Sequence, residues 1–220
     1  DTVVPTSSWT SISDTSLIEG ETATLTVVLS EANSGFTNAD IVCDNGAVAA
    51  LNVAGDGVTY TGVFTPTAEV EDDSNTCVIG TSWTDTAGNS GVGSTSSNYV
   101  IDGVDPTVAS ATMGDTSLIE GETATLTIVM SETVTGFATG DITCENGALG
   151  AIAVAGDGVT WTGTFTPTAE TSDATNTCAV AATYTDTLGN GVGGTGTSNN
   201  YAIDGVDPTV VSTAINDASI

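Results

Sequence analysis

The chain has 220 residues, of which 28 are Asp or Glu and none is Lys, Arg or His, so its formal net charge is −28. Without basic side chains it cannot neutralise nucleic-acid phosphates, and it lacks the histidine or lysine that common nucleophilic and phosphate-binding sites require. About 39% of the residues are apolar, but no apolar run is long enough for a membrane helix. We therefore expect a folded protein that binds no nucleic acid and does not insert into membranes.

A repeat of about 100 residues organises the chain. Residues 14–26 (DTSLIEGETATLT) recur letter for letter at 115–127, and later segments follow in register until the second copy gains one residue after Asn190. A third copy begins near the end. The expected domains are residues 1–102, 103–204 and 205–220, the last being only the first strand of a third repeat. Because no signal peptide is found at Asp1, we expect an internal part of a longer array.

The elements expected in each repeat are strands. Glu21–Ser30 alternates strictly between apolar and threonine side chains, and Thr59–Thr65 and Asn75–Thr84 place their aromatic residues on inward faces. The seven expected strands are Thr2–Ser13, Glu21–Ser30, Asp40–Asp44, Ala47–Ala54, Thr59–Thr65, Asn75–Thr84 and Ser97–Ile101. Seven short strands in this length indicate an all-β fold of tandem immunoglobulin-like β-sandwich domains in an extended array.

Four cysteines recur at equivalent places in the two repeats. Their positions favour bonds within each repeat, Cys43 with Cys77 and Cys144 with Cys178, because strands three and six are neighbours in an immunoglobulin-like sheet. Sequence alone allows three connectivities, and four buried free thiols are the alternative. Disulfides would indicate an oxidising, extracellular setting, and each would stabilise its domain by roughly 3–4 kcal/mol in the chain-entropy model.

Acidic residues gather in the loops at the ends of the expected domains. If strands alternate in direction, loops of two neighbouring repeats meet near the linker Asp102-Gly103-Val104-Asp105-Pro106. The residues expected at the N-terminal pole of the second repeat are Glu132, Asp157 and Asp186, with Asp141 and Asn190 close by. Like charges there would repel by about 1 kcal/mol per pair, and Ca²⁺, with six to eight oxygen ligands, would remove the repulsion. The alternative is a solvated acidic surface, and Asp56 and Asp157 are better explained as turn residues.

Five groups of short motifs point to a family. They are Gly20-Glu21-Thr22-Ala23-Thr24, then Ser30-Glu31 with Gly35-Phe36 and Asp40-Ile41, Tyr60 through Phe64-Thr65-Pro66, Thr84-Asp85 with Gly88-Asn89, and Ile101-Asp102 leading to Pro106-Thr107. Together they resemble the bacterial immunoglobulin-like domains that form the extender regions of giant RTX-type surface adhesins. The resemblance implies calcium at the domain junctions and a role in projecting an adhesive tip from the bacterial cell. The cysteine pair departs from many repeats of this kind.

The resemblance also implies which residues hold the calcium. The positions carried over are Asp85, Asn89, Asp102 and Asp105 in the first repeat, and Asp186, Asn190, Asp204 and Asp207 in the second.

We therefore expect a monomeric, extracellular spacer whose nearest partners are neighbouring repeats of the same chain, while distal adhesive domains contact the surface or host. The alternative is a carbohydrate- or surface-binding module, for which exposed aromatic residues would be expected. A hydrolase that uses paired carboxylates is a third hypothesis, although no deep cleft is evident from duplicated small sandwiches. We do not expect an enzyme.

Overall fold

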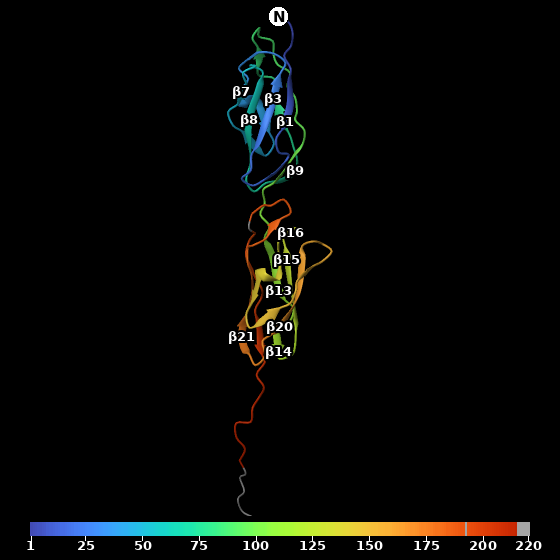
Figure 1. The fold of residues 1–220 in the computed structure, drawn as a ribbon, viewed down its shortest axis with the longest axis vertical. Coiled ribbons are helices and arrows are strands. Elements are labelled where there is room, and N and C mark those ends of the chain that lie inside the picture. The colour runs from blue at the N-terminus through green and yellow to red at the C-terminus, as the bar shows by residue number, and fades with distance from the viewer. Residues whose placement is uncertain (192, 215–220) are drawn as a thin grey trace, which may run out of the picture. The chain divides into compact units, whose positions relative to one another are not determined.

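The structure is a computed structural model that describes residues 1–191 and 193–214. Within these residues the chain forms strands, loops and two single-turn 3₁₀ helices, η1 (Asn38–Asp40) and η2 (Thr139–Asp141) (Figure 1). No helix in the described part is long and apolar enough to span a membrane. Contacts divide the chain into two compact units: residues 1–105 with 188–191, and the remaining described residues from 106 onward.

The first unit has one main antiparallel sheet in the order β1-β3-β8-β6, with β7 also paired to β8. Its strands are β1 (Ser7–Ile12), β3 (Ala23–Leu29), β6 (Gly46–Val48), β7 (Asn52–Val53) and β8 (Thr59–Pro66). The other layer contains a sheet in the order β2-β12-β9 and two short strand pairs, β10-β5 and β11-β4. These strands are β2 (Ser16–Ile18), β4 (Asn33–Ser34), β5 (Ile41–Cys43), β9 (Glu71–Asn75), β10 (Cys77–Ile79), β11 (Thr84–Asp85) and β12 (Tyr99–Asp102).

The second unit repeats this topology. Its main sheet has the order β13-β15-β20-β18, with β19 beside β20, and its other layer contains β14-β25-β21, β16-β23 and β17-β22-β24. The strands are β13 (Val108–Met113), β14 (Ser117–Ile119), β15 (Ala124–Met130), β16 (Val134–Thr135), β17 (Ile142–Cys144), β18 (Gly147–Leu149), β19 (Ala153–Val154), β20 (Thr160–Pro167), β21 (Ser172–Asn176), β22 (Cys178–Val180), β23 (Thr185–Asp186), β24 (Gly196–Thr197) and β25 (Tyr201–Asp204). Both units are immunoglobulin-like sandwiches, as the strand count predicted.

The core of each unit lies between the two layers and follows from strand alternation. Along β3 the four inward side chains, Ala23, Leu25, Val27 and Leu29, are each 1% exposed, whereas the threonines between them face outward. Burying a side chain of this size stabilises the fold by roughly 1.5–3 kcal/mol. Gly62 of β8 leaves room for the Leu51 side chain, because a Cβ atom there would lie 2.7 Å from it.

Several expected strands are divided or displaced in the structure. The expected first strand is shorter, and a separate strand β2 follows it and pairs in parallel with β12. The acidic segment of residues 71–74 was expected in a loop before the strand Asn75–Thr84, but together with Asn75 it forms β9 and pairs with β12. Long-range pairing decides both cases, since strand preference depends on neighbours more than on composition. In the expected third repeat, 205–220, no strand forms within residues 205–214, and the rest lies outside the described residues.

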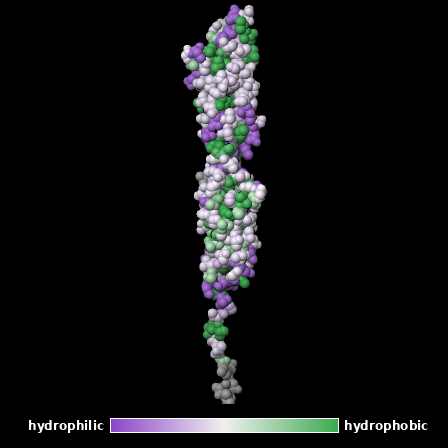
Figure 2. Space-filling view, turned by 45° about the vertical axis from the view of Figure 1, so that its right-hand side comes forward, coloured by the Kyte–Doolittle hydropathy of each residue, from purple (hydrophilic) through white to green (hydrophobic). Residues whose placement is uncertain are grey.

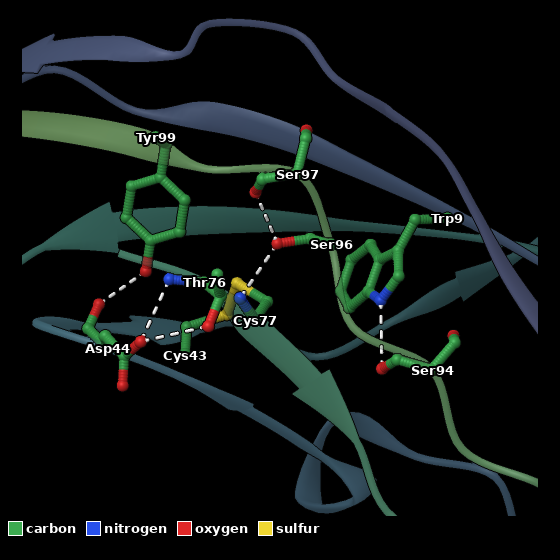
Figure 3. Close-up of a disulfide and its surroundings, with 9 residues drawn as sticks. All are labelled: Trp9, Cys43, Asp44, Thr76, Cys77, Ser94, Ser96, Ser97 and Tyr99. Carbon is green, nitrogen blue, oxygen red and sulfur yellow. Dashed lines mark hydrogen bonds between the residues drawn. A yellow bond between two sulfur atoms is a disulfide. The ribbon is translucent and has the colours of Figure 1, made fainter. Parts of the chain in front are cut away.

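Both expected disulfides are present. Cys43 and Cys77 lie directly opposite each other on β5 and β10 and are bonded, and Cys144 and Cys178 are bonded in the same way on β17 and β22. The bond therefore joins neighbouring strands of one layer and lies at strand ends rather than in the middle of strands (Figure 3). No described cysteine is free.

Candidate metal centre

Asp85 is the most buried carboxylate of the first unit, with an exposed fraction of 1%. It ends β11, where it lies opposite Asn33 of β4, and it opens a tight loop that closes at Asn89. The Asp85 N–H donates to the Asn89 carbonyl oxygen at 3.0 Å, and Gly88 takes a φ of +96°, a conformation that suits glycine. The motif Thr84-Asp85 with Gly88-Asn89 is thus a structural unit that holds one carboxylate in place.

Three hydrogen bonds fix the Asp85 carboxylate. Its Oδ1 accepts from the backbone N–H groups of Ala87 and Asn89, both at 2.8 Å, and its Oδ2 accepts from Asn89 Nδ2 at 2.7 Å. The Asn89 side chain is the main reason that the pKa of Asp85 lies below its ordinary value, and the backbone donors act in the same direction against the effect of burial. Asp85 is therefore ionised in neutral solution.

Two further carboxylates approach Asp85 within the first unit. Oxygens of Asp1, Glu31 and Asp85 all lie within 4.8 Å of one another. Ca²⁺ binds oxygen at 2.3–2.6 Å, so oxygens separated by up to about twice that distance can share one ion. The donor set consists of carboxylates only, which suits a hard cation, and the chain has no basic side chain to neutralise it. The residues therefore fit Ca²⁺.

The backbone near Glu31 and Asp1 is tied to the sandwich. The Ser30 N–H donates to the Thr6 carbonyl oxygen at 2.9 Å, and the Thr6 N–H returns a bond of 2.9 Å to Ser30 Oγ. These bonds hold the end of β3, from which Glu31 projects, against the segment that leads into β1. The Asp1 carboxylate accepts a bond of 2.9 Å from the Val3 N–H.

The repeat relates this cluster to residues further along the chain. A shift of 101 residues aligns Asp1, Glu31 and Asp85 with Asp102, Glu132 and Asp186. Within the second unit, Asp186 ends β23 opposite Val134 and is also 1% exposed. The local position of Asp186 therefore matches that of Asp85.

The other residues implied by the resemblance have different surroundings. Asn190 groups with the first unit, where its side chain accepts a bond of 3.1 Å from the Glu19 N–H and donates one of 2.6 Å to the Asp102 carbonyl oxygen. Asp105, Asp204 and Asp207 are exposed. Asp56 and Asp157 each accept three bonds within their own turns, as expected for turn residues.

Asp1 and Glu31 were not among the ligands implied by the motifs. Two signals were available in the sequence: Glu31 follows β3 directly, like Glu132 after β15, and Asp1 aligns with Asp102. Neither signal gives proximity, because these residues are far apart along the chain. The fold brings them together by pairing β11 with β4 and by bonding Thr6 to Ser30.

Comparisons with solved structures return proteins with several immunoglobulin domains. The chain is similar to the Yersinia pseudotuberculosis adhesin InvE, with 13% identity over 91% of this chain and 58% of that chain and a TM-score of 0.33. It is also similar to the I9–I11 tandem from titin, with 8% identity over 90% of this chain and 65% of that chain and a TM-score of 0.29. A third similar structure is that of the tandem Ig repeats of Dlar, with 13% identity over 91% of this chain and 94% of that chain and a TM-score of 0.24. The chain spans less than two thirds of the first two, and identities and TM-scores this low carry no argument about function.

No match was found among curated proteins. A family described as the bacterial Ig-like domain matches residues 1–101 and again residues 102–203, so that nearly the whole chain is covered by two consecutive copies. The chain therefore belongs to the bacterial Ig-like domain family.

Proposed function

We propose that this chain is a spacer segment of a bacterial cell-surface adhesin, in which calcium bound at the domain ends stiffens the array and helps to project an adhesive tip from the cell. The observation that carries the proposal is the cluster of Asp1, Glu31 and Asp85 in a chain without a single basic residue. Ionised carboxylates at this spacing repel each other, and a divalent cation removes the repulsion.

The repeat supports a role at the junctions. The aligned residues Asp102, Glu132 and Asp186 come from both sides of the linker that follows β12, so one ion bound by all three would connect two domains. The resemblance implies the same location. Asp204 would take the corresponding place before a following repeat.

The composition and the family support a structural rather than a catalytic role. Domains of this family are typically non-catalytic structural modules. Apolar residues on the face drawn in Figure 2 are scattered in small groups among hydrophilic ones, which suits a segment whose flanks remain in water. Two disulfides favour an extracellular location, because such bonds persist in oxidising compartments.

Calorimetric titration of the chain with Ca²⁺ tests the proposal. The double variant Glu31→Gln/Glu132→Gln removes one carboxylate from each repeat and leaves the hydrogen-bonded Asp85 loop intact. We expect the wild-type chain to bind calcium with a dissociation constant on the order of 10⁻⁴–10⁻³ M, as extracellular modules do, and the variant to bind at least tenfold more weakly.

A matched control removes the same charge elsewhere. Glu71→Gln/Asp73→Asn changes two exposed carboxylates of β9 whose side chains make no hydrogen bond within the described residues. We expect this variant to bind calcium like the wild type. If both double variants bound calcium equally weakly, the affinity for calcium would depend only on net charge, and the proposed sites would be wrong.

A further inference from the structure

A groove of about 380 Å³ lies on the first unit and shares no lining residue with the carboxylate cluster. One wall is the strand β1, residues 7–12, and the other is formed by Ser94, Thr95 and Ser97. None of the lining residues is charged, although the chain carries a formal charge of −28. An uncharged groove on so acidic a protein suits a neutral ligand better than a cation.

The β1 wall presents backbone groups to the groove. The Ser13 N–H donates to the Thr24 carbonyl oxygen at 3.0 Å, so the adjacent pair Ile12 and Leu25 is a non-hydrogen-bonded pair of the antiparallel ladder. The N–H and C=O of Ile12 therefore point away from β3. The register also shifts between Trp9 and Ser11, which leaves Thr10 as an extra residue on this edge.

Trp9 is the aromatic residue that lines the groove. Its indole Nε1–H donates to the Ser94 carbonyl oxygen at 3.3 Å, which fixes the ring across the gap between the two walls (Figure 3). The side chain packs only partly against the core. The hydroxyl groups of Ser11, Thr95 and Ser97 make no hydrogen bond to other described residues, so the groove combines a fixed aromatic ring with unpaired hydroxyls.

The second unit closes the same space. Asn199 stands where the first unit has Ser97, and it accepts a bond of 2.6 Å from the Met113 N–H and donates one of 3.3 Å to the Met113 carbonyl oxygen. Met113 is the counterpart of Ile12, so these bonds satisfy the backbone groups that Ile12 leaves open. Ser110 aligns with Trp9 in the sequence, and the register shift falls two residues earlier in β13, so that Ala111 lies opposite Ile128 as Trp9 lies opposite Val27. The groove is thus a feature of the first repeat's own sequence rather than of the fold.

We propose that this groove binds a neutral carbohydrate, one hexose unit of which stacks its C–H face on the Trp9 indole. The sugar hydroxyls would exchange hydrogen bonds with the Ile12 backbone and with Ser11, Thr95 and Ser97. The volume is at the lower end of that of small-molecule sites, which run from about 300 to 1,000 Å³. Tryptophan supplies a rigid apolar surface at little entropic cost, and the open backbone groups supply orientation. The binding would be independent of calcium.

Two-dimensional NMR of the isotopically labelled chain tests the proposal. Maltose, cellobiose, lactose, N,N′-diacetylchitobiose and α1,2-mannobiose are titrated in turn. We expect at least one of them to give saturable shifts confined to the amides of residues 7–13 and 93–98 and to the Trp9 indole N–H, with millimolar affinity. Trp9→Ser, which installs the residue that aligns with Trp9 in the sequence of the second repeat, should reduce the affinity at least tenfold.

Ser97→Asn is the matched variant, because it introduces the side chain that closes the gap in the second unit and leaves Trp9 in place. We expect it to abolish the shifts while the rest of the spectrum is retained. Absence of saturable shifts with all five sugars would overturn the proposal, as would equal binding by Trp9→Ser. An extended Ser/Thr-rich peptide that shifts the same amides while the sugars do not would identify a strand-addition edge and would also overturn it.

Discussion

Tyr99 and Tyr201 each tie the last strand of their sandwich to the residue that follows its first disulfide-bonded cysteine. The Tyr99 hydroxyl donates to the Asp44 carbonyl oxygen, and the Tyr201 hydroxyl donates to the Glu145 carbonyl oxygen at 2.6 Å. Burial, with the nearby Glu145 charge, raises the pKa of Tyr201 from 10.0 to about 12, and burial raises the pKa of Tyr99 as well. The stability linked to each raised pKa is complete below the ordinary tyrosine value and is lost as the pH rises through the folded value.

We predict that Tyr201→Phe lowers the free energy of unfolding of the second unit by about 1 kcal/mol, because the Glu145 carbonyl loses its donor. The variant should also lose less stability than the wild type between about pH 10 and about 12, since no phenol remains to ionise there. Urea denaturation at several pH values measures both effects. An identical alkaline loss in the variant would show that Tyr201 is not its cause.

In the second unit, the side chain of Trp161 has a buried hydrogen-bond donor without an acceptor. Its Nε1 atom has no hydrogen-bond partner among the described residues. In the first unit the equivalent residue, Tyr60, accepts a bond of 2.7 Å from Asn33 Nδ2, but the second repeat has Val134 in place of that asparagine. An unpaired buried polar group costs about 1–3 kcal/mol.

We predict that restoring the first repeat's pair in the second repeat removes this cost. Val134→Asn and Trp161→Tyr should be more favourable together than the sum of the single changes, by about 1 kcal/mol, because only the double variant forms the amide-to-hydroxyl bond. A double-mutant cycle from urea denaturation gives this coupling. A coupling of zero would mean that the pair does not form in the second unit.

The strand pairs β5-β10 and β17-β22 are the elements that depend most on a covalent bond. Each pair has only three residues per strand, and each is closed by a disulfide between directly opposite residues that are 34 apart in sequence. We predict that Cys43→Ala/Cys77→Ala lowers the free energy of unfolding of the first unit by about 3 kcal/mol and leaves the second unit unchanged. Differential scanning calorimetry should then show one transition displaced to lower temperature and one retained. A displacement of both transitions would contradict local stabilisation.

How much the sequence predicts differs among the elements. β3 and β15 were predictable because alternate residues share one face, and the disulfides were predictable because equivalent cysteines recur in both repeats. β2 and β9 were not, because the first depends on parallel pairing with β12 and the second carries acidic residues that resemble a loop. At the candidate site, the motif led to Asp85 and Asn89. Glu31 and Asp1 join them only in three dimensions, through loop positions that spacing does not encode.

At the scale of the whole chain, the proposed calcium role would account for both the missing basic residues and the repeat. A net charge of −28 has no internal compensation, and two of the carboxylates, Asp85 and Asp186, are 1% exposed at equivalent positions. Monovalent salt at 0.1 M largely screens exposed charges that are more than about 10 Å apart, but it does not supply a ligand-bound cation at a fixed site. Calcium should therefore stiffen the array, whereas sodium chloride of equal ionic strength should not.

Small-angle X-ray scattering of the chain in saturating Ca²⁺, and in EGTA with sodium chloride at matched ionic strength, tests the central claim most directly. If calcium bound at the domain ends stiffens the array, the maximum dimension will be larger in calcium and the scattering will fit a single extended particle, whereas the EGTA sample will require a range of interdomain angles. The Glu31→Gln/Glu132→Gln variant should resemble the EGTA sample under both conditions. Identical scattering of the wild-type chain in calcium and in EGTA would contradict the account.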